Sequence, residues 1–138
     1  MRQLVAKIIL FLVILFLVDT ALGICFQTLV DSAKGGETRR VNYICKQTSE
    51  DLLIFGSSRA LHHYDPLLLE DSLQMSCYNC GKDGNGIILL YGWFKMIQQR
   101  YHPQMIVYDV MPNFDLWKGD NMAYLPGLRY YYGEPAVD

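Results

Sequence analysis

The feature that most limits the possible folds of this chain is an apolar run that ends abruptly at a glycine and two serines. Residues 52–55 read Leu-Leu-Ile-Phe, and Gly56, Ser57 and Ser58 follow. Such a run is typical of a strand covered on both faces, as strands of parallel sheets are. Glycine suits the tight turn from that strand into a helix. The run therefore predicts an α/β fold, with both serines at the carboxyl end of a strand, where open α/β sheets bind their ligands.

Two roles fit serines at this place. The start of a helix offers free backbone N–H groups and a positive dipole end to an oxyanion, so a nucleophile there is chemically reasonable. Alternatively, Ser57 and Ser58 only cap the next helix, which is a common use of serine. Arg59 after them either holds an anionic group or is an ordinary surface residue.

Composition limits the size of the fold and the kinds of partner. The chain has 138 residues, of which 51% are hydrophobic and 19% charged, and this suits one domain at most. The formal net charge is −2, and the basic residues are scattered rather than grouped with aromatic ones. We therefore expect no nucleic-acid partner.

The N-terminal segment reads as a membrane anchor. Residues 8–26 are apolar except for Asp19 and Thr20, and their length is close to the ~20 residues with which a helix crosses a bilayer. Arg2 and Lys7 precede them, which predicts a cytoplasmic N-terminus and an exported remainder. Residues 1–26 are thus expected to form a single transmembrane helix, with the rest periplasmic or at the cell surface.

Two details leave room for a cleaved signal peptide. Asp19 in lipid costs about 3 kcal/mol on insertion scales, although its place toward the outer end lets it reach the interface. Residues 21–23, Ala-Leu-Gly, form a weak cleavage site. Cys25 does not resemble a lipoprotein acceptor, because Ile24 precedes it. The apolar run continues past the cleavage site, which favours an uncleaved anchor, and both alternatives export the remainder.

The rest of the chain alternates strands and helices. We expect residues 27–49 to be a juxtamembrane linker, with 41–46 a short edge strand or simply linker, and the folded part to occupy residues 50–138. Further strands are predicted over residues 76–79 and 105–108, and helices over residues 58–62, 66–71, 87–100 and 122–131. The predicted buried positions of the long helix are 87, 90, 91, 94 and 97. This order implies right-handed parallel crossovers, and hence a three-layer α/β fold with a parallel sheet.

Three loops that follow the predicted strands carry complementary chemistry. They contain the residues Gly56-Ser57-Ser58, the segment 79–84 and the segment 111–113. Parallel strands point their carboxyl ends the same way, so the loops are expected to meet at one edge of the sheet. A serine, a backbone N–H beside a glycine and an asparagine amide are what acyl transfer through an oxyanion hole requires.

These loops resemble the sequence blocks of the SGNH (GDSL-like) hydrolase superfamily, and more closely its membrane-anchored envelope members with a Gly-Ser-Ser-Arg block. The resemblance covers about residues 50–115. It implies that Ser58 is the nucleophile, that Asn79 and Gly84 form the second block, and that Asn113 is the asparagine of the third. The backbone amides of Ser58 and Gly84 and the Asn113 side chain would then hold the oxyanion, on a flavodoxin-like sheet that is incomplete here.

The chain departs from that family in two places. The third block normally reads Gly-x-Asn-Asp, whereas here Phe114 follows Asn113 and Asp115 is one place late. The family's Asp-x-x-His, which supplies the base, lies further downstream than residue 138. His62 is one helical turn after Ser58 and is a conceivable substitute for this base. A histidine in such a position is, however, more commonly an ordinary solvated surface residue.

The resemblance implies a membrane-anchored extracytoplasmic serine esterase or acyltransferase that acts on acyl groups of cell-envelope glycans. That chemistry needs no cofactor. The competing hypothesis is a non-catalytic, truncated fragment that serves only as a membrane-anchored structural or interaction module. The sequence leaves the oligomeric state open.

The cysteines predict neither a metal nor a definite disulfide. Cys77 and Cys80 form a Cys-x-x-Cys pair, but no second pair with zinc-site spacing follows. We interpret them, with Cys45, as small buried residues around the second strand, while a disulfide remains open in an exported chain.

Overall fold

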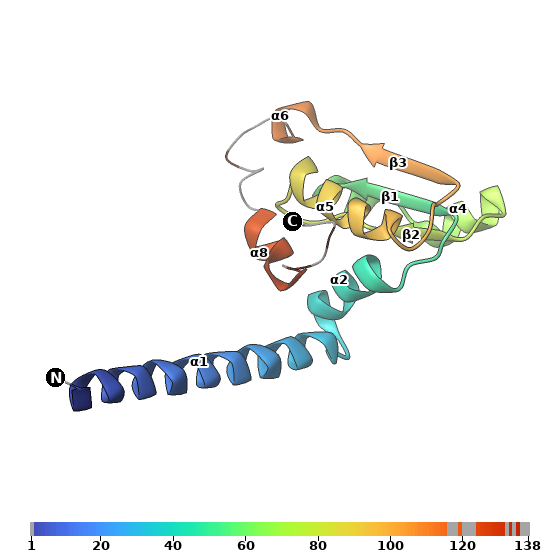
Figure 1. The fold of residues 1–138 in the computed structure, drawn as a ribbon. Helices are drawn as coiled ribbons and strands as arrows, with labels where there is room; N and C mark the ends of the chain where they lie inside the picture. Colours follow the sequence, from blue (N-terminus) through green and yellow to red (C-terminus); the bar gives the residue numbers. More distant parts are fainter. Residues whose placement is uncertain (1, 116–118, 120–123, 132, 134, 136–138) are drawn as a thin grey trace. The chain divides into compact units, whose positions relative to one another are not determined.

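The structure is a computed structural model that describes residues 2–115, 119, 124–131, 133 and 135. Contacts between residues divide the chain into two compact units, Met1–Arg39 and Arg40–Asp138. Figure 1 shows the elements of both units.

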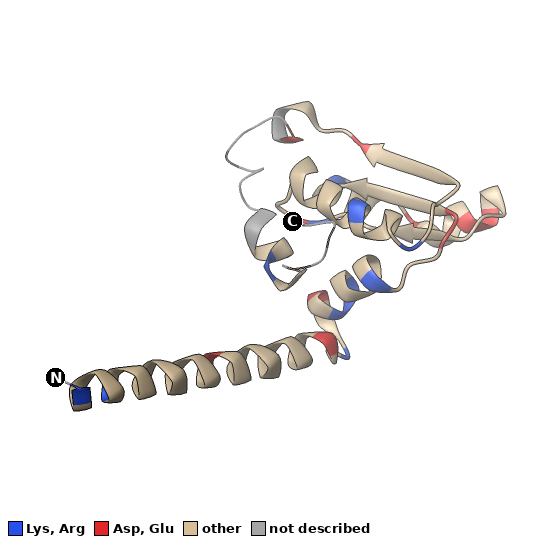
Figure 2. Cartoon of the chain, in the orientation of Figure 1, with Lys and Arg blue, Asp and Glu red and all other residues tan. Residues whose placement is uncertain are grey.

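The first unit is dominated by one helix, α1 (Arg2–Asp31), in which no residue is buried. At about 1.5 Å per residue, its 30 residues exceed the ~30 Å of a bilayer's hydrocarbon core. Its charged residues are Arg2, Lys7, Asp19 and Asp31 (Figure 2). The helix is thus long and apolar enough to cross a membrane, and an N-terminal signal sequence has the same properties. The helix continues past Asp19 to Asp31.

The second unit is built on a sheet of three parallel strands, β1 (Leu52–Gly56), β2 (Cys77–Asn79) and β3 (Met105–Asp109). Their order is β2-β1-β3, so the first strand is central. Leu52 pairs with both Cys77 and Met105 at the amino ends of the strands. This confirms the predicted α/β fold with a parallel sheet behind an apolar N-terminal helix.

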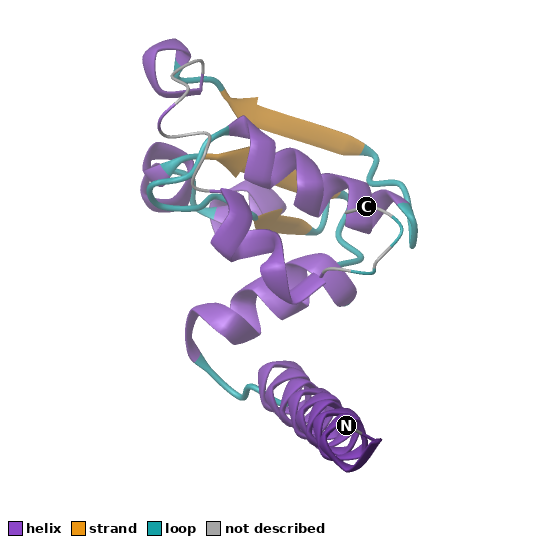
Figure 3. Ribbon diagram, turned by 60° about the vertical axis from the view of Figure 1, so that its left-hand side comes forward, coloured by secondary structure: helices purple, strands orange, loops and turns teal. Residues whose placement is uncertain are grey.

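Helices cover both faces of this sheet (Figure 3). Leu53 and Phe55 of β1 belong to one apolar cluster, which is shared with α5 (Ile87–Gln98). Leu52 and Ile54 belong to a second cluster, with Ala60 of α3 (Ser58–His63) and Leu69 of α4 (Pro66–Leu73). Side chains alternate between the faces of a strand, so one unbroken apolar run fills two cores.

The start of α4 follows the predicted signal. Asp65 is its N-cap, and its side chain accepts a hydrogen bond from the Leu67 backbone N–H at 3.0 Å. Pro66 occupies the first helical position, where a missing N–H is harmless. The helix ends at Leu73, two residues later than predicted, where Gln74 takes the left-handed conformation.

The segment expected to be an edge strand or linker is instead part of a helix, α2 (Gly36–Lys46). Its buried residues are Asn42, Ile44 and Cys45. The Arg100 guanidinium donates hydrogen bonds to the carbonyl oxygens of Ile44 (3.2 Å), Cys45 (3.1 Å) and Thr48 (2.8 Å). A cation at a helix C-terminus satisfies carbonyls that have no partner within the helix. The second unit therefore begins at Arg40 rather than near Glu50.

The buried face of α5 matches the prediction at Leu90 and Ile97 but differs from it at Ile87 and Tyr91. Its buried residues are Leu89, Leu90, Trp93, Met96 and Ile97, whereas Ile87 is 45% and Tyr91 59% exposed. Nearly every residue of this helix is apolar, so the hydrophobic period does not select one face. Packing against β1 determines which face of the helix is buried, and Lys95 lies on the exposed face.

The described C-terminal residues form short helical pieces. These are α6 (Pro112–Asp115), α8 (Tyr124–Leu128) and a 3₁₀ turn, Arg129–Tyr131. Residues 122 and 123 of the predicted helix over 122–131 lie outside the described residues. Leu128 and Tyr131 complete the core beside α5, and the Tyr131 hydroxyl donates to Asn42 Oδ1 at 2.8 Å.

Candidate functional site

The turn that follows β1 permits no side chain at its glycine. Gly56 has φ 151°, a value that L-residues rarely adopt. A Cβ on Gly56 would lie 2.7 Å from Ala60 Cβ and 3.0 Å from Asp109 Cβ. The close approach lets the chain pass from strand to helix beside the end of β3.

The two serines after this glycine differ in exposure. Ser57 is only 2% exposed, and its Oγ has no hydrogen-bond partner among the described residues. Although Ser57 holds the N-cap position of α3, its side chain makes no capping bond. Ser58 is the first residue of α3 and is exposed. A capping hydrogen bond therefore does not account for Ser57, and Ser58 is the solvent-exposed serine of the two.

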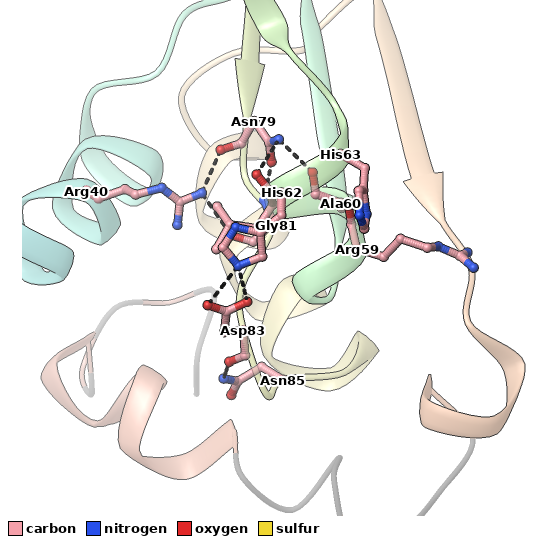
Figure 4. Close-up of polar contacts among 10 residues, drawn as sticks. Arg40, Arg59, Ala60, His62, His63, Asn79, Gly81, Asp83 and Asn85 are labelled. Carbon is pink, nitrogen blue, oxygen red and sulfur yellow. Dashed lines mark hydrogen bonds and ion pairs between the residues drawn. The ribbon is translucent and has the colours of Figure 1, made fainter.

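The loop after β2 is hydrogen-bonded to this turn. The Lys82 N–H donates to the Gly56 carbonyl at 2.9 Å. The Asn79 side-chain amide donates to the carbonyls of Ala60 (2.8 Å) and Tyr64 (3.0 Å) in and after α3, and its Oδ1 accepts from the Gly81 N–H at 2.9 Å (Figure 4). Asn79 thus fixes the second loop against the helix that begins at Ser58.

Arg40 of α2 holds the same loop from its other side. Its guanidinium donates to the carbonyl oxygens of Asn79 at 2.7 Å and Gly81 at 2.8 Å (Figure 4). Gly84, further along the loop, is exposed, has φ 65° and has no atom within 4 Å of where its Cβ would be. Its surroundings therefore leave room for a ligand to approach.

An ion pair joins the first loop to the end of β3. Arg59 Nε donates to Asp109 Oδ2 at 2.7 Å, and Arg59 Nη2 contacts both Asp109 Oδ1 and, at 2.9 Å, the Val110 carbonyl. Asp109 is 8% exposed and pairs with Gly56 in the sheet register. Arg59 thus links α3 to the end of β3, a structural role that neither alternative from the sequence, an anion-binding group or an ordinary surface residue, included.

This ion pair predicts a pH-dependent stability. Hydrogen bonding to Arg59 lowers the pKa of Asp109, against the opposing effect of burial. A carboxyl whose folded pKa is depressed stabilises the fold above its unfolded pKa of about 3.9, and the contribution is lost as the pH falls through the folded value. Asp109→Asn is therefore expected to lower the melting temperature at pH 7, with the gap to the wild type narrowing as the pH falls below about 3.9.

Thermal melts of both proteins across this pH range would measure the gap. Asp71→Asn, at an exposed position of α4, is the control and is expected to change the melting temperature little at any pH. A gap for Asp109→Asn that stays constant down to pH 3 would contradict the assignment.

Asn113 follows β3 within the short helix α6. Asp115 stabilises this piece, because its carboxylate accepts hydrogen bonds from the Met111 N–H and the Tyr108 hydroxyl, both at 2.8 Å. The strands are parallel, so Ser58, Gly84 and Asn113 all follow the carboxyl ends of their strands, at one edge of the sheet.

The three histidines lie in different environments. His62 Nε2 lies 3.0 Å from Asp83 Oδ1, which links α3 to the loop after β2 (Figure 4). His63 Nδ1 lies 3.1 Å from the Arg59 carbonyl oxygen. His102 precedes β3 and is therefore at the opposite edge of the sheet from Ser58. The sequence pattern gave no sign of Asp83, because its partner is 21 residues away.

The cysteines are buried free thiols in the second unit. Burial raises the pKa of Cys45 to about 12 and also raises that of Cys80. Cys77 and Cys80 belong to different apolar clusters, on opposite faces of the sheet. They are small core residues, as the sequence suggested. Among the described residues, no group of three or more His, Cys, Asp or Glu side chains is placed to hold a metal ion.

Comparison of the chain with protein-family models, with curated proteins and with solved structures finds no match. The functional argument therefore depends on the geometry at the carboxyl edge of the sheet and on the sequence blocks that lie there.

Proposed function

We propose that residues 40–138 form a serine esterase or acyltransferase domain of the SGNH type, with Ser58 as its nucleophile. The observation that carries this proposal is the contrast between the two serines at the Gly56 turn. Ser58 is exposed at the start of α3, while Ser57 is buried without a partner among the described residues. A strand–turn–helix that presents one hydroxyl at the carboxyl edge of a parallel sheet suits nucleophilic attack.

The reaction proceeds through an acyl-enzyme. Ser58 Oγ bonds to the ester carbonyl carbon, its proton passes to a base, and the carbonyl oxygen becomes an oxyanion. The backbone amides of Ser58 and Gly84 and the Asn113 carboxamide are the proposed donors to that oxyanion. Collapse releases the alcohol, and water or a sugar hydroxyl then accepts the acyl group. Loss of one oxyanion donor is expected to reduce turnover about 10²–10³-fold.

The proposed place of this reaction is the outer side of a membrane. Uncleaved, α1 would anchor the domain, and Arg2 and Lys7 at its start favour a cytoplasmic N-terminus. The resemblance to envelope enzymes suggests acyl groups on cell-envelope glycans as substrates. In the alternative, α1 is a cleaved signal sequence that exports the same domain.

Labelling by a fluorescent fluorophosphonate tests the nucleophile in the full-length chain. In isolated membranes the wild type is expected to be labelled, with the label resisting carbonate extraction as an anchored protein does. Ser58→Ala is expected to abolish labelling, because the reacting oxygen is removed.

Ser57→Ala is the matched control for this experiment. It removes a neighbouring hydroxyl that has no hydrogen bond to lose among the described residues, so labelling and melting temperature are expected to stay close to wild type. Labelling that persists in Ser58→Ala, or that never occurs in the wild type, would refute the proposed nucleophile.

A second candidate function is a non-catalytic interaction module, and one observation favours it. Apolar side chains remain exposed along α5 and β3: Ile87 (45%), Ile88 (41%), Tyr91 (59%), Met105 (45%) and Ile106 (43%). Such a patch often marks a protein contact. An unlabelled but folded wild type would favour this candidate over the hydrolase.

A further inference from the structure

The unassigned contact nearest to the proposed nucleophile is the pair formed by His62 and Asp83. His62 lies on α3 and Asp83 on the loop after β2, one residue before Gly84. Their side chains point toward one another, with Nε2 3.0 Å from Oδ1 and 3.3 Å from Oδ2 (Figure 4). The pair therefore joins the two loops that carry the proposed nucleophile and an oxyanion donor.

Helix geometry places His62 beside Ser58. Residues four apart on a helix share a face, with Cβ atoms about 5–6 Å apart. The later side chain leans back toward the helix start. The His62 ring is accordingly directed over the turn that begins with Ser58, on the face that also meets Asp83.

The contact with Asp83 decides which ring nitrogen is free. The ionised carboxylate only accepts hydrogen bonds, so the neutral imidazole carries its proton on Nε2 and donates it to Asp83. The lone pair is then on Nδ1, the ring nitrogen bonded next to the side-chain stem and therefore nearer the helix backbone. A carboxylate that holds a histidine in one tautomer is the usual way of orienting a base toward a serine.

We infer that His62 is the general base for Ser58 and that Asp83 is its positioning residue; this inference rests on the proposed nucleophile. As Ser58 Oγ bonds to the carbonyl carbon, the hydroxyl proton moves to His62 Nδ1. When the tetrahedral intermediate collapses, the carbon–oxygen bond to the alcohol breaks and that proton moves to the alcohol oxygen.

The required contact forms as substrate binds. Within the described residues Ser58 and His62 share no hydrogen bond, and contacts of this kind often tighten only in the substrate complex. Both partners of the His62–Asp83 pair are solvent-exposed, at 61% and 57% of their side-chain areas. An ester carbonyl can therefore reach the space above the first turn of α3.

The rate of fluorophosphonate labelling of the full-length chain tests the base. His62→Ala is expected to slow labelling at least about 100-fold, the lower range of general-base catalysis. Imidazole added to the buffer is expected to restore part of the lost rate, which a purely structural histidine would not permit. His63→Ala is the matched control, because His63 lies near the Arg59 carbonyl of its own helix and not beside Asp83, and it is expected to label at the wild-type rate.

A double-mutant cycle tests the positioning role of Asp83. Asp83→Asn is expected to slow labelling about fivefold, because it weakens a hydrogen bond worth about 1 kcal/mol that orients the ring. In the His62→Ala background the same substitution is expected to have no effect, because no ring remains to be oriented.

The outcomes separate this inference from the proposed function. If Ser58→Ala abolishes labelling while His62→Ala is labelled at the wild-type rate, Ser58 is confirmed as the nucleophile and His62 is not its base. A slowed His62→Ala that imidazole does not rescue would also overturn the base. If Ser58→Ala is labelled like the wild type, the proposed function itself fails.

Discussion

Trp93→Ala is expected to lower the free energy of unfolding by about 3–5 kcal/mol, the usual range for removing a large aromatic side chain from a core. Trp93 is completely buried, in the cluster that joins α5 to Leu53 and Phe55 of β1. Its indole N–H has no hydrogen-bond partner among the described residues, so the loss comes from packing and from the cavity left behind. Since domains are stable by about 5–15 kcal/mol in total, this one change removes a large share.

Tyr91→Ala is the matched control on the same helix. Tyr91 is another large aromatic residue, but it is 59% exposed, and surface substitutions usually change the free energy of unfolding by less than about 0.5 kcal/mol. Urea unfolding of the full-length chain in detergent, followed by circular dichroism, measures both. Equal midpoints for the two variants would show that the buried face of α5 has been assigned wrongly.

Gly56→Ala is expected to be strongly destabilising for so small a substitution. Its φ of 151° imposes backbone strain of about 1–3 kcal/mol on any L-residue. The added methyl group would also lie 2.7 Å from Ala60 Cβ, and overpacking of that kind costs about 1–3 kcal/mol more. The strain falls on the turn that presents Ser58, so both stability and labelling are expected to fall.

Gly84→Ala separates the cost of the backbone strain from the cost of the overpacking. Gly84 also has a positive φ, 65°, but nothing lies within 4 Å of the added carbon. It is expected to show only the backbone cost, about 1–2 kcal/mol. The melting temperature of Gly56→Ala should therefore be clearly the lower of the two, and similar values would refute the close approach between the Gly56 turn and β3.

The sheet and its neighbouring helices could be predicted because their signals are local. The apolar run of β1 needed no partner to be recognised, and Asp65 and Pro66 marked the start of α4. The α2 helix was not predicted, because its apolar residues, Val41, Tyr43, Ile44 and Cys45, lie in a segment too short to show a clear helical period. What makes it a helix is distant, since Arg100 binds its last carbonyls from more than 50 residues away.

The site was predictable to a smaller extent than the fold. Strand direction and loop position were enough to bring Ser58, Gly84 and Asn113 to one edge of the sheet. The contacts that stabilise this edge were not predictable, because Arg59 and Asp109 are 50 residues apart and neither carries a local signal.

The two hydrogen bonds from Arg40 to the loop after β2 decide where the chain can be divided. Cutting at Glu50, the boundary that composition suggests, would remove this arginine together with the Ile44 and Cys45 side chains of the core. A shortened version for crystallisation or solution work has to keep all of α2. The place to cut is residues 32–35, which precede α2, because a cut within α2 would break the helix that carries Arg40.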